Sequence, residues 1–395
     1  MNYASIVPLI GGETIAMERV FEKRPEYILS YPDFYANDSQ LLSYYNNEVP
    51  YNTVSEVNNP KKVDVVNTVC PCAGLSSLGT TASATSPVND WMYTSAKYVL
   101  ENIQPKVFWG ENAPRLASKA GKEVVDRLRV IAKDNGYTFS LYKTKSILHG
   151  LSQIRDRSFY FFWKGNAVPE FEFYDRPYTR IEEQIRSSAR NDPDPMTELL
   201  VNTAVPSDDP WYQYILEEIH GGIDHTEFFK KIDKTANTME YIEKHIDSYH
   251  DVSKWFKSKG YEKASEKATR VAEKLASGGN VMRKTLEIPK DYIGAFVGHY
   301  PTKLTHPDVD RHLSVRECLD IMKMPKDFQL QGGLKNLNMI CQNVPVTTAM
   351  DMAENVKRFV EDDIELYPSS FAIQDNKGKT FWYEKEAYTL DDCFN

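Results

Sequence analysis

Short apolar runs alternate with amphipathic stretches along the first 165 residues of the chain. An amphipathic helix is predicted at 121–135, because apolar residues recur on one stripe from Val124 to Ile131 and Gly136 follows the last turn. This strand–helix rhythm predicts an α/β fold, with a mainly parallel sheet covered by helices on both faces. Strands are predicted at 5–10, 27–31, 62–69, 106–110, 137–143 and 158–163, and further helices at 13–21, 38–45 and 95–103.

The pattern changes after residue 164. Aromatic, proline and acidic residues fill 166–222 without a clear period. A helical pattern follows over 224–277 and begins with a capping-box pair, Asp224 and Glu227. A pattern typical of an α/β domain returns after 305, with helices expected at 314–323 and 346–362. We therefore expect the first part of an α/β catalytic domain at 1–165, an inserted smaller domain at 166–305, and a return to the first domain at 306–395.

Composition sets broad limits on what the chain does. Its 395 residues, 41% hydrophobic and 26% charged, are typical of a soluble globular protein with more than one domain. No apolar run is long enough to span a membrane, and the N-terminus lacks the basic region of a secretory signal. Five cysteines without disulfide-like spacing indicate a reducing compartment, so we expect a cytoplasmic protein of a bacterial or phage-infected cell. A net charge of −9 argues against coating nucleic acid through bulk charge, but not against a local basic face.

A loop rich in proline, cysteine and glycine follows the third predicted strand. The strand ends near Val69, and the loop that follows contains Cys70, Pro71 and Cys72. Such a loop would project Cys72 into the cleft at the carboxyl edge of the sheet, where open α/β folds hold ligands. On this pattern alone Cys72 could be reactive or inert. Cys70 and Cys72 could also form a metal or redox pair, although no second cysteine pair and no nearby histidine supports that interpretation.

Three later segments carry candidate partners of Cys72. One is a carboxylate, Glu111, directly after the fourth predicted strand. Another is the alternating series Gln153, Arg155 and Arg157 just before the sixth. Because side chains two apart on an extended stretch face the same side, the two guanidinium groups are expected to point together. The third is the segment 311–328.

In their order along the chain, these segments resemble the signature of the DNA cytosine-5 methyltransferases. That signature is a Pro-Cys loop, Glu-Asn-Val, Gln-x-Arg-x-Arg, a variable target-recognition region, a segment ending in Pro-x-x-Phe, and Gly-Asn-x-Val-Pro. Each motif is weak alone, but five in order around one insertion indicate kinship. The resemblance implies an S-adenosylmethionine-dependent methyltransferase-like (Rossmann-like) fold, a mixed sheet with an inserted smaller target-recognition domain. The matching segments are Pro71-Cys72, Glu111-Asn112-Ala113, Gln153-x-Arg155-x-Arg157, Arg311 to Phe328, and Cys341 to Pro345.

The resemblance also implies a reaction: methyl transfer from S-adenosylmethionine to carbon 5 of cytosine in double-stranded DNA. Carbon 5 is a poor nucleophile until a thiolate adds at carbon 6, and the resemblance gives that role to Cys72. Glu111 would hold ring nitrogen 3 and the exocyclic amine, and Arg155 the carbonyl oxygen. Arg155 or Arg157 would supply the positive charge that deprotonates Cys72. Because none of these groups reaches a stacked base, the target must be flipped out of the duplex.

The expected donor site departs from the family more than the base site does. Leu9 stands where the family has its first glycine, Tyr31 where it has a ribose-binding glutamate, and Gln342 where it has an asparagine. Asp33, two residues after Tyr31, is then expected to hold the ribose hydroxyls. The residues expected to bind the cofactor are Ile10, Gly11, Gly12, Asp33, Pro71, Asn343 and Val344.

Double-stranded DNA is the expected partner. Lys254 and Lys257 begin a locally basic run, 254–290, for which a solvated helical face and contact with DNA phosphates are equally good interpretations. Ser76 and Gln153 are also expected to contact DNA. We expect a monomer with no obligate protein partner and no membrane association. We expect no metal site, since none of the eight histidines has metal-ligand spacing, and we expect Cys318 and Cys341 to be buried.

Two alternatives stay open at this point. Because the departures gather around the donor, the chain could modify cytosine with an altered donor, such as a modified S-adenosylmethionine. From a different class, it could be a catalytically silent DNA-binding protein that keeps the fold. The sequence also leaves open whether the role is restriction-modification, protection from restriction or DNA hypermodification.

Overall fold

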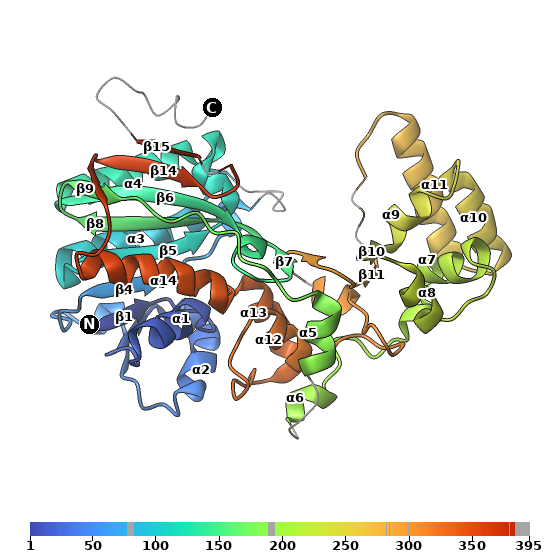
Figure 1. The fold of residues 1–395 in the computed structure, drawn as a ribbon, viewed down its shortest axis with the longest axis horizontal. Coiled ribbons are helices and arrows are strands. Elements are labelled where there is room, and N and C mark those ends of the chain that lie inside the picture. The colour runs from blue at the N-terminus through green and yellow to red at the C-terminus, as the bar shows by residue number, and fades with distance from the viewer. Residues whose placement is uncertain are drawn as a thin grey trace. The chain divides into compact units, whose positions relative to one another are not determined.

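A computed structural model of the chain describes residues 1–76, 83–188, 194–281, 283, 285–298, 300–378 and 380–383, with 300 and 380–383 described by their backbone alone. The chain forms two compact units (Figure 1). Unit 1 consists of residues 1–178, 322–331 and 342–395, and unit 2 consists of 179–321 and 332–341.

Unit 1 is built on a mixed sheet, in which the described residues form nine strands in the order β15-β14-β6-β8-β5-β4-β1-β2-β3 (Figure 1). The strands are β1 (Tyr3–Ile6), β2 (Ile28–Ser30), β3 (Tyr51–Thr53), β4 (Val65–Thr68), β5 (Val107–Asn112), β6 (Tyr137–Lys145), β8 (Asp156–Lys164), β14 (Phe371–Asp375) and β15 (Thr380–Tyr383). Two short strands, β9 (Ala167–Pro169) and β13 (Leu366–Pro368), pair beside this sheet, and β7 is Gln153–Ile154.

The strand order alone indicates at which edge of the sheet a ligand would bind. Strands β3, β2, β1, β4 and β5 run parallel, as in a doubly wound sheet, and the order reverses between β1 and β4. Ligands of such folds bind outside the carboxyl ends of the strands at this switch point. Strand β8 lies antiparallel between β5 and β6, which makes the sheet mixed. The predicted α/β, S-adenosylmethionine-dependent methyltransferase-like sheet is confirmed, while β3, β14 and β15 were not predicted.

Helices cover both faces of this sheet (Figure 1). On one face the ring of Trp163, from β8, lies 4.7 Å from that of Phe359, from α14. On the other, the guanidinium of Arg129, from α4, lies 4.4 Å from the ring of Phe371. The helices of unit 1 are α1 (Gly12–Phe21), α2 (Tyr35–Tyr44), α3 (Asp90–Tyr98), α4 (Lys122–Asp134) and α14 (Val346–Val360).

Two sequence predictions of local structure had different outcomes. The helix predicted at 121–135 is α4, and Gly136 follows it with a φ of +77°, as expected of a glycine that ends a helix. The strand predicted at 5–10 is wrong beyond Ile6, because the backbone turns there and Val7 and Leu9 take positive φ angles. The apolar run 7–10 is therefore a buried loop.

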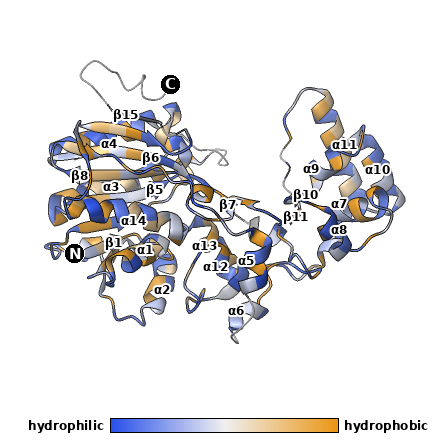
Figure 2. Cartoon of the chain, in the orientation of Figure 1, coloured by the Kyte–Doolittle hydropathy of each residue, from blue (hydrophilic) through white to orange (hydrophobic). Residues whose placement is uncertain are grey.

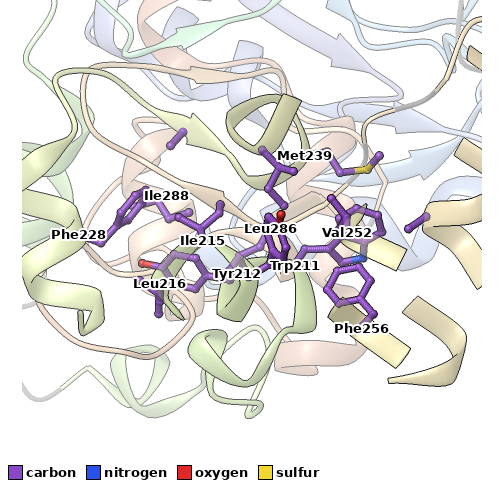
Figure 3. Packing of buried hydrophobic residues seen from close by; sticks show 14 of the residues in the cluster. Trp211, Tyr212, Ile215, Leu216, Phe228, Met239, Val252, Phe256, Leu286 and Ile288 are labelled. Carbon is purple, nitrogen blue, oxygen red and sulfur yellow. The ribbon is translucent and has the colours of Figure 1, made fainter. Parts of the chain in front are cut away.

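Unit 2 is mainly helical and has its own apolar core. Its core packs aromatic and aliphatic side chains such as Trp211, Tyr212, Phe228 and Phe256 (Figure 3). Helices α10 and α11 carry both hydrophobic and hydrophilic residues (Figure 2), as expected of helices with one buried face. The elements are α5 (Ile181–Ser188), α6 (Pro195–Glu198), α7 (Pro210–Gln213), α8 (His225–Lys231), α9 (Thr238–Glu243), α10 (Tyr249–Ser258), α11 (Glu262–Ala276), α12 (Val315–Ile321) and α13 (Leu337–Gln342), whose last residue lies in unit 1, with β10 (Ala236–Asn237), β11 (Glu287–Ile288) and β12 (Ile293–Gly294).

The predicted start of the helical region is confirmed. The Asp224 side chain caps α8 by accepting a hydrogen bond from the backbone N–H of Glu227 at 2.8 Å. Within the described residues, no helix is both long and apolar enough to cross a membrane.

Candidate active site

Cys72 lies in the loop that follows β4. The loop leaves the sheet after Thr68, and Cys72 is half-buried at the start of a 3-10 turn, η3 (Ala73–Leu75). Gly74 is required in this turn, because a Cβ there would lie 2.4 Å from Oδ1 of Asn89. The Asn89 amide in turn donates to the carbonyls of Ser83 and Ala84. Asn89, which was not singled out from the sequence, therefore packs against the turn that follows Cys72.

Glu111 and Arg157 form a buried ion pair beside this loop. Glu111 is the penultimate residue of β5 and is 2% exposed. Its cross-strand partner on β8 is Phe159, so Arg157, two residues earlier, projects from the same face of the sheet. Arg157 Nε contacts Glu111 Oε1 directly. The antiparallel insertion of β8 thus brings together two residues that are 46 positions apart.

Arg155 is placed just before β8 and is among the largest fully buried side chains. Its backbone carbonyl accepts the N–H of Ser146, at 3.0 Å, so the segment between β6 and β8 is tied back on itself. A buried hydrogen-bond network around His149 holds the same segment in place. His149 donates or accepts at Thr144 Oγ1 (2.6 Å) through Nε2 and pairs with Asp351 Oδ2 (2.8 Å) through Nδ1.

Burial raises the pKa of the Cys72 thiol above its ordinary value, and the Glu111 carboxylate raises it further. Arg157 and Arg155 oppose this shift but do not reverse it. The two guanidinium groups act in the expected direction, since both lower the pKa of the thiol, but burial and Glu111 outweigh them in the free protein. Their charges act on Cys72, however, so the four expected catalytic residues do lie together at the ends of β4, β5 and β8.

The loop between β1 and α1 has an unusual backbone. Val7, Leu9 and Gly11 have φ angles of +51°, +52° and +94°. Positive φ is easy for glycine but costly for a β-branched or bulky residue. The buried carboxylate of Asp38 interacts with the backbone N–H of Leu9, and Tyr51 donates to Asp38 Oδ2 at 3.2 Å. Asp38 was not singled out from the sequence, and burial raises its pKa to about 7.

The first turn of α1 packs against the segment that precedes α14. The Gly12 N–H donates to Asn343 Oδ1 at 2.9 Å, and a Cβ on Gly12 would lie 2.0 Å from the carbonyl oxygen of Val344. Gly11, Gly12, Asn343 and Val344, all expected to bind the cofactor, are thus brought together and are buried. In this conformation Gly12 contacts Asn343 and Val344, while Gly11 packs against Leu41.

Aromatic rings gather at the end of β2. The ring centroid of Tyr31 lies 4.7 Å from that of Trp91, on α3, and the Phe34 centroid lies 5.0 Å from Trp91. Asp33, expected to hold the ribose, is exposed beside them. The position that the family gives to a glutamate is therefore part of an aromatic cluster.

Comparison with known proteins identifies the family to which the chain belongs. Residues 20–358, most of the chain, match the family model of the C-5 cytosine-specific DNA methylases. The chain belongs to this family. Its enzyme class is accordingly DNA cytosine-5 methyltransferase.

Individual relatives of this DNA methylase are distant. The type II methyltransferase M.FnuDI of Fusobacterium nucleatum is 25% identical over 298 residues, which cover 74% of this chain and 76% of that protein. Among solved structures, the methyltransferase EhMeth of Entamoeba histolytica has a TM-score of 0.53 at 12% identity, covering 92% of this chain and 98% of its own. A prophage-encoded E. coli protein assigned as a DNA modification methyltransferase has a TM-score of 0.56 at 14% identity, covering 91% and 99%. These structures show the shared fold.

The residues of the methylase that are expected to contact DNA differ in how exposed they are. Gln153 is fully buried and its Nε2 donates to Met322 Sδ at 3.6 Å, so it offers nothing to DNA in this conformation. Ser76 is half-buried after η3. Lys254 and Lys257 are exposed on α10, and Lys254 pairs with Asp251 at 3.0 Å.

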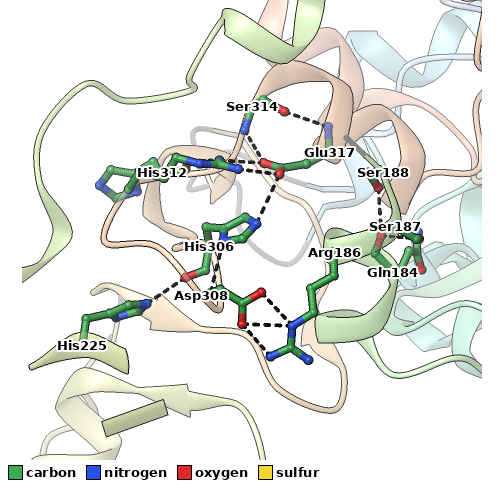
Figure 4. Close-up of polar contacts among 11 residues, drawn as sticks. Gln184, Arg186, Ser187, Ser188, His225, His306, Asp308, His312, Ser314 and Glu317 are labelled. Atoms are coloured by element: carbon green, nitrogen blue, oxygen red, sulfur yellow. Dashed lines mark hydrogen bonds and ion pairs between the residues drawn. The ribbon is translucent and has the colours of Figure 1, made fainter. Parts of the chain in front are cut away.

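The segment 311–328, one of those that resemble the family signature, begins with a polar network in unit 2 (Figure 4). Glu317, fully buried, accepts from Arg311 at 2.8 and 3.0 Å and from the backbone of Ser314 at 2.7 Å. His306 lies 3.6 Å from Glu317, and burial lowers its pKa to about 4. This network fixes the start of α12 rather than forming a reactive site, since each of its charges has a partner in unit 2.

The other three cysteines that the structure describes are buried. Cys70 is buried with Sγ 3.3 Å from Thr68 Oγ1, and Cys318 and Cys341 are buried as expected. The described part of the chain contains no group of three or more His, Cys, Asp or Glu side chains that could hold a metal ion.

Proposed function

We propose that this protein transfers a methyl group from S-adenosylmethionine to carbon 5 of a flipped-out cytosine in double-stranded DNA, through a covalent intermediate on Cys72. The observation that carries the proposal is the meeting of Cys72, Glu111, Arg155 and Arg157 at the ends of adjacent strands. A nucleophile, an acid and two cations at one strand edge are what addition to a pyrimidine ring requires.

Cys72 would act as a thiolate, forming a bond to carbon 6 of the base. Because its pKa is raised in the free protein, deprotonation has to follow substrate binding. Engagement of Glu111 by the base would remove the negative charge that disfavours the thiolate. The positive charges of Arg157 and Arg155 would then have the larger effect on Cys72 and would lower the pKa of its thiol.

Glu111 would bind ring nitrogen 3 and the exocyclic amine of the cytosine. Its present partner, Arg157, would keep the carboxylate oriented until the base arrives. As electrons move from the Cys72 bond into the ring, the proton lost by the Cys72 thiol would pass through the Glu111 carboxylate to nitrogen 3. Arg155 would bind the carbonyl oxygen. After methyl transfer, nitrogen 3 would return its proton to Glu111 and carbon 5 would lose its proton to water. Expulsion of the Cys72 thiolate, which takes the proton back from Glu111, would then restore the starting state.

The residues at the switch point fit S-adenosylmethionine in chemical type. The rings of Tyr31, Phe34 and Trp91 offer a stacking surface for an adenine, and the exposed Asp33 lies beside them for the ribose hydroxyls. Ile10, Gly11, Gly12, Pro71, Asn343 and Val344 would surround the rest. When bound, the donor supplies an electrophilic methyl group to carbon 5.

We assign DNA contact to the exposed lysines of α10, Lys254 and Lys257, together with Ser76. The expected insertion at 166–305, which falls mostly in unit 2, would then be the target-recognition region. We expect the protein to act as a monomer in the cytoplasm. A modified donor remains a second candidate, because the family's ribose-binding glutamate is replaced by Tyr31 in the aromatic cluster.

Two measurements test this function. Mass spectrometry of nucleosides from cells expressing the protein should show 5-methylcytosine, absent with Cys72→Ala; another mass on cytosine would favour the altered donor. A duplex containing 5-fluorocytosine should form a covalent adduct that needs Cys72 and S-adenosylmethionine. If no adduct forms with any donor while the protein still binds DNA, the catalytically silent alternative is correct.

A further inference from the structure

Glu13, in the first turn of α1, is a buried carboxyl group that the proposed mechanism does not use. It is fully buried, and no well-formed hydrogen bond from the described residues reaches either of its oxygens, although the Asn67 side chain lies near enough to favour the charged form. A buried carboxyl without a partner is costly, and native proteins keep such groups rarely. Its presence therefore calls for a function.

The fold directs Glu13 toward the reacting end of the site. The next residue, Thr14, contacts Ser5 of β1 and Asn67 of β4, so this turn lies over the sheet near those strands' carboxyl ends. Asn67 is paired in register with Trp109 on β5, and Glu111 is two residues further along the same face. Glu13 accordingly interacts with Glu111.

The groups around Glu13 do not neutralise it. Glu111 from β5 is an acid, Cys70 after β4 is a thiol and Tyr160 from β8 a phenol, while Arg157 is already paired with Glu111. Burial and Glu111 raise the pKa of Glu13 well above its usual range, and the Asn67 side chain offsets only part of this. In the free protein the site therefore favours the neutral carboxyl, and a cation brought into the site would favour the carboxylate.

We propose that Glu13 pairs with a cationic group at the amino-acid end of S-adenosylmethionine, its sulfonium or its α-ammonium. The inference rests on the proposed function. The donor's methyl group has to approach carbon 5 of a base held by Glu111, and Glu13 is the buried acid beside Glu111. DNA phosphates are excluded as its partner by their charge.

Isothermal titration calorimetry of three ligands tests the pairing. S-adenosylmethionine carries both cations, S-adenosylhomocysteine carries the ammonium alone, and 5′-methylthioadenosine carries neither. The variants are Glu13→Gln, which keeps the shape of the side chain, and Glu18→Gln on the same helix as the matched control, since Glu18 already accepts from Tyr45 at 2.8 Å. Thermal unfolding of Glu13→Gln, expected at or above the wild-type temperature, shows that the variant folds.

We expect Glu13→Gln to weaken S-adenosylmethionine binding about tenfold or more, with Glu18→Gln unchanged. Equal loss for S-adenosylhomocysteine identifies the ammonium as the partner, and no loss identifies the sulfonium. Wild-type protein should release a proton on binding S-adenosylmethionine, measured in buffers of different ionisation enthalpy, and Glu13→Gln should not. Wild-type-like binding by Glu13→Gln overturns this inference alone. Failure of the wild type to bind any of the three ligands overturns the proposed donor as well.

Discussion

The proposed base side and the proposed donor side of the candidate active site are built by different means. On the base side, specific side chains are present at strand ends: Cys72, Glu111, Arg155 and Arg157. On the donor side the backbone takes conformations suited to glycine, although Val7 and Leu9 occupy two of the positions. The comparison teaches that neighbouring strands can hold a loop in a backbone path that the loop's own side chains do not favour.

Keeping that path requires support from elsewhere. Each positive φ at a non-glycine residue costs on the order of 1–3 kcal/mol. The support is local: Val7 donates to Leu29 and accepts from Val69, and Asp38 interacts with the N–H of Leu9. Because both flanking strands hold the loop, its shape is set by the sheet as much as by its own sequence.

Glu111→Gln should produce the largest effect and should affect the base side alone. The amide keeps the shape but cannot deliver a proton to the ring, so we expect kcat to fall by about 10²- to 10³-fold. S-adenosylmethionine affinity, measured by calorimetry, should stay within about threefold of wild type. Glu123→Gln, on the exposed side of α4, is the control. An equal loss of donor binding would show that the two sides are not separable.

Gly12→Ala tests the packing on the donor side. The new Cβ would lie 2.0 Å from the Val344 carbonyl, which cannot move without shifting the segment before α14. We expect a loss of about 3 kcal/mol in the free energy of unfolding, near the upper end for overpacking. Gly136→Ala is the matched control: φ is +77° and no atom lies within 4 Å of the added Cβ, so about 1 kcal/mol is expected. Similar losses in urea unfolding would contradict the packing argument.

Sequence could predict the base side because its chemistry is carried by residue types at predictable places. The placement of a cysteine, a glutamate and two arginines at strand ends could be predicted once the strands were recognised, whereas their roles came from the family resemblance. Asp38 and Asn89 could not be found this way, since each is a single polar residue whose importance comes from backbone that it meets only in the folded chain, at Leu9 for Asp38 and at Gly74 for Asn89. Gln153 shows the converse, because its motif suggested DNA contact and its side chain is buried.

The fold was predictable to a similar degree. The periodic helix α4 and most strands of the first 165 residues emerged from their patterns, whereas β14 has only three consecutive apolar residues, 371–373, and no strand was predicted there. The loop at 7–10 was misassigned because a buried apolar loop and a buried strand have the same composition.

Asp38→Asn tests whether the donor loop depends on a titrating support. The folded-state pKa of about 7 lies above the ordinary value of 3.8, so the folded protein retains a proton that the unfolded chain releases. The stability from this group is present below pH 4 and is lost as the pH rises to about 7, by at most about 4 kcal/mol. Asp38→Asn should therefore flatten the dependence of unfolding free energy on pH between 4 and 7. The exposed Asp33→Asn should follow the wild-type curve, and a parallel curve for Asp38→Asn would contradict the assignment.

Lys257→Ala should have the smallest effect and leave both sides of the active site intact. Lys257 is exposed on α10, so its loss should remove about one phosphate contact and lower the salt dependence of DNA binding by about one unit of slope. The weakening should be a few-fold and equal for all DNA sequences, because phosphates carry no base information. Lys259→Ala is the control, since Lys259 is paired with Glu217 at 2.6 Å. Fluorescence anisotropy over a salt series measures both slopes. An unchanged slope for Lys257→Ala would mean that α10 is a solvated face, and that contacts with DNA come from other parts of the chain.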